Sequence, residues 1–269
     1  MIERKVKRIK LVVQYDGTDF CGWAEQSQVR TVQGTLKESI RRAIGEEVEL
    51  RGASRTDSGV HATGQVCDFA THVPIPSEKW PRILNRLLPM DMRVYRASFV
   101  PLRFHSRFFA RSRVYEYRMV EDEHPNPMIS RYVFNAGYSL DVEAMNSCAQ
   151  LLLGTHDFSG FAIGVQEIEN PVRTMLVANV NRVRDEVRIR LEATAFLRGM
   201  VRKIAGALWE IGRGKRSVEE FEALLQKEVW MKSKPPRVLP PKGLTLVKVK
   251  YGRRLRDIRE EYGTMDEDE

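Results

Sequence analysis

Apolar and polar residues alternate along several short stretches of the chain, as they do in strands that bury one face of a sheet. Strands are therefore expected over residues 6–15, 47–51, 65–71, 92–100, 107–120, 174–183, 186–194 and 244–251. Elsewhere apolar residues recur every three or four positions, which is the period of an amphipathic helix. This spacing predicts helices over residues 31–45, 77–88, 141–153, 197–212 and 217–226.

The order of these elements is β-α-β-β-α-β, and the second half of the chain roughly repeats it. That is the order of a ferredoxin-like unit. We therefore expect an α+β protein with one such half over residues 1–103 and another over 104–252. Two halves of this kind would place their sheets side by side with a cleft between them. Residues 253–269 are dense in charge and are expected to form a disordered tail.

The chain carries an excess of positive charge, with 44 Lys and Arg against 36 Asp and Glu. The net charge of +8 favours a polyanionic partner, of which nucleic acid is the first candidate. Three cysteines without CxxC spacing argue against a zinc site or a disulfide framework. Neither a transmembrane-length apolar run nor a signal-peptide core is evident, so we expect no membrane association and a cytoplasmic protein.

A short loop between two expected strands holds the strongest candidate for chemistry. It runs over residues 52–62, and its glycines permit a sharp bend around Arg55 and Asp57. In one interpretation Asp57 only forms a turn and Arg55 is a surface charge. In the other, Asp57 is a nucleophile or base that Arg55 holds in its ionised form, because a nearby cation favours a carboxylate. The loop alone does not decide between these interpretations.

Arginines and aromatic residues are interleaved between residues 103 and 118, and basic residues recur near the long helix. Arginine binds phosphate and aromatic rings stack on bases, so this composition suits an RNA groove. An ordinary half-buried strand and a solvated helix face would show the same patterns. The candidate RNA-binding residues are Arg107, Arg111, Arg113, Arg118, Arg198 and Lys203.

The five histidines show no metal-ligand spacing and are interpreted as polar loop residues. Neither a GxxxxGK[ST] nor a GxGxxG phosphate loop occurs, which argues against chemistry driven by a nucleotide.

The loop sequence SRTDSGVHA at residues 54–62 resembles the GRTDxGVHA signature of the TruA-type tRNA pseudouridine synthases. Other landmarks of that family follow in order between residues 6 and 251. They are YDGT at 15–18, TVQG at 31–34, FH at 104–105, RVYEYR at 113–118, HDF at 156–158, PVRT at 171–174, FLRGMVR at 196–202 and PPKGL at 240–244.

The resemblance implies two ferredoxin-like halves with a central mixed, mainly antiparallel sheet and a basic cleft between them. It further implies a homodimer that isomerises uridine to pseudouridine at positions 38, 39 and 40 of the tRNA anticodon stem-loop, without cofactor or metal. By position, Asp57 matches the essential aspartate, Arg55 the arginine that helps to flip the target nucleotide, and Tyr115 the tyrosine that stacks on uracil. Arg202 matches the basic residue that pairs with the aspartate, and His61, within the signature, is a further candidate for RNA contact.

Two residues depart from the family pattern, namely Ser54 in place of glycine and Ala24 in place of glutamine. Neither departure touches Arg55, Asp57 or Tyr115, so we expect activity to be kept; Ser54 is expected to stiffen the loop slightly and Ala24 to remove a polar contact to substrate. Two other functions compete with the synthase. One is a non-catalytic RNA-binding module, and the other is a phosphodiesterase that uses His61 or His105 as acid and base.

Overall fold

A computed structural model describes residues 5–122, 124, 126–226 and 229–252 of the chain. Its main feature is a single ten-stranded sheet, in which the neighbouring strands follow the order β4-β1-β3-β10-β5-β9-β8-β7, with β2 beside β3 and β6 beside β5. The strands are β1 (Lys7–Tyr15), β2 (Arg51–Gly52), β3 (His61–Thr71), β4 (Met92–Val100), β5 (Ala110–Val120), β6 (Phe134–Asn135), β7 (Gly154–Asp157), β8 (Val172–Val183), β9 (Glu186–Ala193) and β10 (Leu244–Tyr251). The α-helices are α1 (Val32–Ile44), α2 (Trp80–Leu84), α3 (Val142–Gln150), α4 (Met200–Gly212) and α5 (Val218–Glu222).

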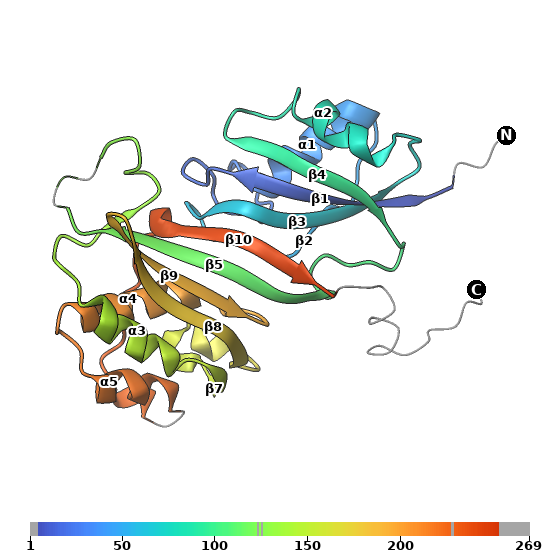
Figure 1. Ribbon diagram of the computed structural model, residues 1–269. Coiled ribbons are helices and arrows are strands. Elements are labelled where there is room, and N and C mark those ends of the chain that lie inside the picture. The colour runs from blue at the N-terminus through green and yellow to red at the C-terminus, as the bar shows by residue number, and fades with distance from the viewer. Residues whose placement is uncertain (1–4, 123, 125, 227–228, 253–269) are drawn as a thin grey trace.

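The two halves repeat one arrangement of strands. In the first half the order is β4-β1-β3-β2, and in the second it is β10-β5-β9-β8, which is the same order when each half is counted from its own first strand. Within each of these two sets of four strands the paired strands are antiparallel. Helices α1 and α2 lie over the strands of the first half, and α3, α4 and α5 lie by those of the second (Figure 1). The predicted pair of ferredoxin-like halves is thereby confirmed.

The helices form where their sequences place caps and apolar faces. The side chain of Thr31 accepts a hydrogen bond from the backbone of Gly34 at the start of α1, and Asp141 caps α3 in the same way. Helix α4 buries nearly every side chain along its length, including Ile204 and Leu208. Its burial explains why this helix can carry a functional residue on a rigid support.

A very short β2 makes the junction of the two halves possible. Because β2 covers only two residues, it pairs with β3 at Cys67 and Asp68 and leaves the start of β3 open. Strand β10 fills that place in parallel, with Thr245 opposite His61 and Leu246 opposite Ala62. The two halves therefore share one continuous sheet, and the segment between β2 and β3 emerges at their junction.

Several predicted bounds are confirmed and others are wrong. Strands β4 and β10 have the predicted ends. Strand β3 begins at His61 rather than at residue 65, because its first residues pair with β10, which lies far away in the sequence. The helix predicted over residues 77–88 is shorter, because a 3₁₀ turn leads into α2, which ends at Leu84. The side chain of the next residue, Asn85, bonds the N–H and the carbonyl of Val94 on β4 and so ties the chain to the sheet at this point.

Further corrections concern the second half. Helix α4 begins at Met200 because Gly199 adopts a left-handed backbone. The helix predicted over 217–226 is the short α5 and a 3₁₀ turn. The short strands β6 and β7 were not predicted. The charged tail, 253–269, lies outside the described residues. Among those residues, no helix is long and apolar enough to cross a membrane.

Candidate active site

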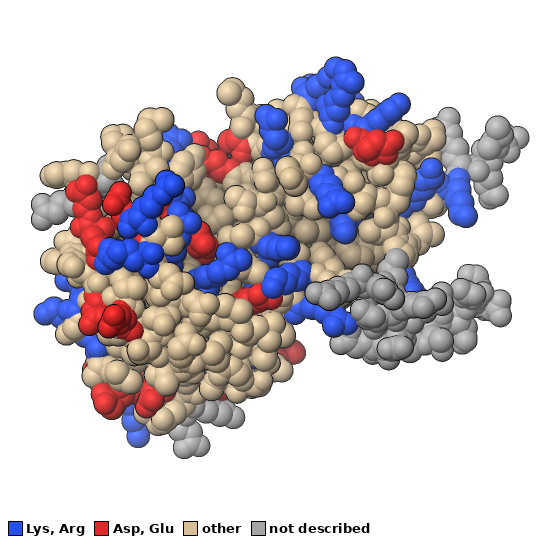
Figure 2. All heavy atoms as spheres, in the orientation of Figure 1, with Lys and Arg blue, Asp and Glu red and all other residues tan. Residues whose placement is uncertain are grey.

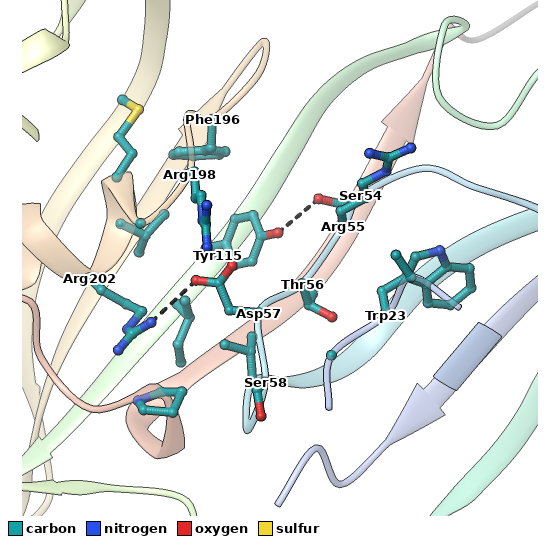
Figure 3. A pocket seen from close by; sticks show the side chains of 18 of the residues that line it. Trp23, Ser54, Arg55, Thr56, Asp57, Ser58, Tyr115, Phe196, Arg198 and Arg202 are labelled. Carbon is teal, nitrogen blue, oxygen red and sulfur yellow. Dashed lines mark hydrogen bonds and ion pairs between the residues drawn. The ribbon is translucent and has the colours of Figure 1, made fainter. Parts of the chain in front are cut away.

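The segment between β2 and β3 forms one wall of a cleft at the junction of the two halves. The cleft has a volume of about 1100 Å³. Its other walls come from β5, the segment that leads into α4, and the start of β10 (Figure 3). Among the described residues that line it, Asp57 is the one acidic residue and six are arginines, namely Arg55, Arg107, Arg113, Arg173, Arg198 and Arg202. A cleft of this composition attracts an anionic ligand.

Backbone and buried polar contacts fix the loop that carries Asp57. The backbone N–H of Trp23 donates to the Thr56 carbonyl at 3.0 Å. On the other side the Thr56 hydroxyl bonds that of Tyr15, at 2.8 Å. Gly59 adopts a left-handed backbone, and a Cβ there would approach Pro241 to 2.8 Å. The loop is thus held in one conformation on both sides of Asp57.

Asp57 pairs with a cation from α4. Arg202 Nη1 lies 3.3 Å from Asp57 Oδ2, and the Arg202 Nε donates to the Leu239 carbonyl at 2.7 Å. The Asp57 side chain remains 35% exposed, so a ligand in the cleft can reach its carboxylate. Arg55, by contrast, is exposed and points away from Asp57 (Figure 3). Among the described residues Asp57 pairs with Arg202 and not with Arg55, so the structure does not support the hypothesis that Arg55 holds Asp57 ionised.

Tyr115 lies beside Asp57 on β5. Its ring meets that of Phe196 edge to face at 5.1 Å, and its hydroxyl bonds that of Ser54 at 2.9 Å. The pKa of the Tyr115 phenol is raised to about 12, mainly by burial; the Ser54 hydrogen bond opposes this rise and the nearby Asp57 charge adds to it. The phenol is consequently protonated at neutral pH and can donate a hydrogen bond into the cleft.

Comparison with known proteins identifies the group of proteins to which this arrangement belongs. The profile of the tRNA pseudouridine synthase family matches residues 11–108 and 148–252, which is more than half of the chain. The chain belongs to the tRNA pseudouridine synthase family. It is 40% identical over 247 residues to tRNA pseudouridine synthase A of Anoxybacillus flavithermus, with 91% of this chain and 99% of that protein covered.

Two further relatives carry the same name. The protein of Halalkalibacterium halodurans is 44% identical over 222 residues, with 82% of this chain and 84% of that protein covered. That of a Thermoanaerobacter species is 38% identical over 246 residues, with 91% of this chain and all of that protein covered. The likeness thus spans both halves and the cleft between them.

The structure brings part of the predicted arginine set to the cleft of this family member. Arg107 and Arg198 line the cleft with exposed side chains. Arg198 lies in the turn before α4 rather than on the predicted helix face. Arg113 also borders the cleft, but its guanidinium is buried and donates to the carbonyls of Ala53, Arg107, Ala110 and Thr194. Arg113 therefore holds the cleft wall together and is not free to bind a ligand.

Three predicted RNA-binding residues do not line the cleft. Arg118 and Tyr115 are three positions apart on β5, so they point to opposite faces of the sheet. The Arg118 guanidinium pairs with Glu186. Figure 2 shows basic and acidic side chains mixed over the surface of the second half in this view. Lys203 instead donates to the Ala162 carbonyl at 2.7 Å. Arg111 lies at the start of β5, beside Gly252.

His61 is buried and is not a polar loop residue as predicted. It is the first residue of β3, and its Nδ1 accepts a hydrogen bond from Gly17. Its Nε2 lies 3.1 Å from the carbonyls of both Arg131 and Lys242, so it joins three segments. Burial lowers the pKa of His61, against the opposing effect of Asp16. These contacts argue against RNA contact at His61.

The phosphodiesterase hypothesis also loses its support in this family member. Neither His61 nor His105 lines the cleft. His105 Nδ1 accepts a hydrogen bond from the backbone of Arg107, and its ring packs on Phe108 at 4.3 Å. His61 and His105 therefore both make contacts within the protein rather than facing the cleft.

Ser54, Phe196 and Arg173 also line the cleft, although none of them was predicted as a site residue. Ser54 was treated only as a departure from the family pattern, whereas its hydroxyl reaches Tyr115. Phe196 and Arg173 lie in landmark motifs of the sequence, but no role was attached to them there. The Arg173 Nε is buried without a partner among the described residues, which marks this arginine as a candidate for ligand binding.

Proposed function

We propose that this protein isomerises uridine to pseudouridine in tRNA, at positions 38, 39 and 40 of the anticodon stem-loop. The observation that carries the proposal is the single carboxylate of Asp57, which lies beside Tyr115 in a cleft lined by six arginines. The chain's membership of the tRNA pseudouridine synthase family supports the reaction. The choice of positions rests on the resemblance of its motifs.

The reaction breaks the N1–C1′ bond, turns the uracil, and joins C5 to C1′. The C5 proton is then lost and N1 gains one, so the product is an isomer of the substrate. Asp57 acts on this centre either as a nucleophile or as a proton acceptor. Arg202 holds its carboxylate in place and balances its charge, at a separation of 3.3 Å. No co-substrate is consumed.

Tyr115 stacks on the flipped uracil. Because its phenol has a pKa of about 12, it serves as a hydrogen-bond donor rather than as a general base at neutral pH. The edge-to-face contact with Phe196 keeps the ring in position.

The arginines have two tasks. Arg55 is exposed and forms no ion pair with any described residue, so it is available to enter the RNA stem and occupy the space of the flipped nucleotide. Arg107, Arg173 and Arg198 bind backbone phosphates around that position.

A homodimer in the cytoplasm is part of the same proposal. Strand β4 is at an edge of the sheet and exposes Tyr95 and Phe99 by 67% and 43%, and an exposed apolar edge strand can pair with another chain. All three cysteines are free thiols, as expected in a reducing compartment. Light scattering should give about twice the chain mass of 31.1 kDa. A monomer of full activity would contradict the dimer.

The function is tested with purified protein and unmodified tRNA transcripts. Pseudouridine should form at positions 38, 39 and 40 when these are uridine, and not in transcripts that carry cytidine there. Binding of tRNA without pseudouridine formation would instead support a non-catalytic RNA-binding module. Shortened RNA would support a phosphodiesterase.

A further inference from the structure

Ser54 is the one described residue that bonds the Tyr115 hydroxyl. The two oxygens are 2.9 Å apart. Tyr115 is only 6% exposed, and a buried hydroxyl without a hydrogen-bond partner is unfavourable. Ser54 thus supplies a partner at the tip of the ring, on the side of the cleft that also carries Asp57.

The backbone of Ser54 is itself fixed. The side-chain amide of Gln65, which is fully buried, donates to the Ser54 carbonyl at 2.7 Å. The preceding Ala53 N–H donates to the Val66 carbonyl at 2.8 Å. With its backbone held on β3, the Ser54 hydroxyl can adopt only the few positions that rotation about one bond allows. It is therefore a rigid support and not a mobile surface group.

Tyr115 is consequently held at two points. The rings of Phe196 and Tyr115 meet edge to face at an interplanar angle of 84°, and Ser54 holds the Tyr115 hydroxyl. Figure 3 shows the Tyr115 hydroxyl facing that of Ser54. When Ser54 donates to the Tyr115 oxygen, the Tyr115 proton is left free for another acceptor. The ring contact sets the plane of the tyrosine, and the hydroxyl contact sets the position of its polar end.

We propose that Ser54 is a positioning residue, which holds the Tyr115 hydroxyl so that the tyrosine stays aligned beside Asp57 and the target uracil. This inference rests on the proposed function. It differs from the expectation that a serine at this place only stiffens the loop, because it assigns the effect to the side-chain hydroxyl and to its contact with one residue.

A double-mutant cycle separates the two accounts. Ser54→Ala removes the hydroxyl and keeps a Cβ, Ser54→Thr keeps the hydroxyl, and Tyr115→Phe removes its partner. We expect Ser54→Ala to lower the single-turnover rate of pseudouridine formation roughly tenfold, as for loss of one polar contact, with KM nearly unchanged. Ser54→Thr should restore most of the rate. In a Tyr115→Phe background, Ser54→Ala should have almost no further effect.

Two results overturn the inference while leaving the proposed function intact. One is a Ser54→Ala rate equal to that of the wild type, and the other is an additive loss in the Tyr115→Phe background, which would indicate loop stiffness. If the wild type forms no pseudouridine, the proposed function fails instead.

In that case a measurement that needs no turnover still tests the contact between Ser54 and Tyr115. The exchange of the Tyr115 hydroxyl proton with water can be followed by NMR of Cζ-labelled tyrosine and assigned with Tyr115→Phe. It should be faster in Ser54→Ala than in the wild type, and an unchanged exchange rate would contradict the inference.

Discussion

Asp57 is both ion-paired and accessible, and this combination determines what it can do. A pair of partly exposed charges contributes little to stability, so the contact with Arg202 serves mainly to orient the carboxylate. Tyr115 beside it is buried and neutral. Asp57, its partner Arg202 and the neutral Tyr115 thus lie together in the cleft, each held by a different segment of the chain.

The raised pKa of the Tyr115 phenol predicts that the folded protein loses stability in alkali. An unfolded tyrosine ionises near its ordinary value of 10, whereas the folded one stays protonated up to about 12. Unfolding then releases a proton, so stability falls as pH rises from 10 to 12, by at most about 1.4 kcal/mol per pH unit for this group. In urea unfolding at pH 9, 10 and 11, Tyr115→Phe should lose less stability over this range than the wild type. An identical loss would show that Tyr115 ionises normally in the folded protein.

At the scale of elements, the loop between β2 and β3 depends on close packing against Pro241, in the 3₁₀ turn that precedes β10. A Cβ on Gly59 would lie 2.8 Å from Pro241, at a left-handed φ of +76°. Gly45 has a similar φ of +74°, but nothing lies within 4 Å of its Cβ position. The two glycines therefore share the same backbone requirement and differ in their surroundings.

This difference predicts unequal effects of two alanine substitutions. Gly45→Ala should cost only the strain of the left-handed backbone, roughly 1–2 kcal/mol, and leave activity unchanged. Gly59→Ala should add a cost for the contact with Pro241, roughly 1–3 kcal/mol more, and reduce pseudouridine formation because Asp57 shifts. Urea unfolding and a turnover assay measure both effects. Equal losses of stability would argue against tight packing of the loop.

The elements also show where sequence reasoning succeeds. Caps and alternation are local, so the caps at Thr31 and Asp141 and the bounds of β10 could be predicted. The start of β3 at His61 could not, because it depends on pairing with Thr245. In the site, the pairing of Asp57 with Arg202 followed from the resemblance and is confirmed. The alternation that suggested RNA contact at Arg118 carries no information on which sheet face meets the cleft.

On the scale of the whole molecule, two ferredoxin-like halves form one sheet and enclose a cleft of positive charge at their junction. The division of the chain near residue 103 stays a prediction. Away from the cleft, on the opposite face of the second half, arginines such as Arg188 and Arg190 pair with Glu116. Charge is therefore unbalanced at the cleft and largely balanced on this other face.

This distribution predicts a localised salt dependence of tRNA binding. The affinity should fall steeply with salt, and Arg198→Ala should reduce the log–log slope by roughly one unit, because one phosphate contact is lost. Arg190→Ala is the matched control, since it removes an equal charge from the opposite face. Filter binding at several salt concentrations measures the slopes. Affinity that does not depend on salt, or equal slope changes for both variants, would contradict the basic cleft.

The most direct test of the account is a comparison of Asp57→Asn with the wild type. Asparagine has nearly the same size and forms the same turns, so the loop should persist, but the negative charge and the basic oxygen are lost. Asp19→Asn, at an exposed position on the loop after β1, is the control for charge alone. With tRNA labelled by tritium at uracil C5, release of tritium from Asp57→Asn should fall by roughly 10²- to 10⁴-fold or more. Filter binding should change by about tenfold or less, equivalent to about 1.4 kcal/mol. Turnover by Asp57→Asn at a rate near that of the wild type would contradict the assignment of Asp57 as the catalytic residue.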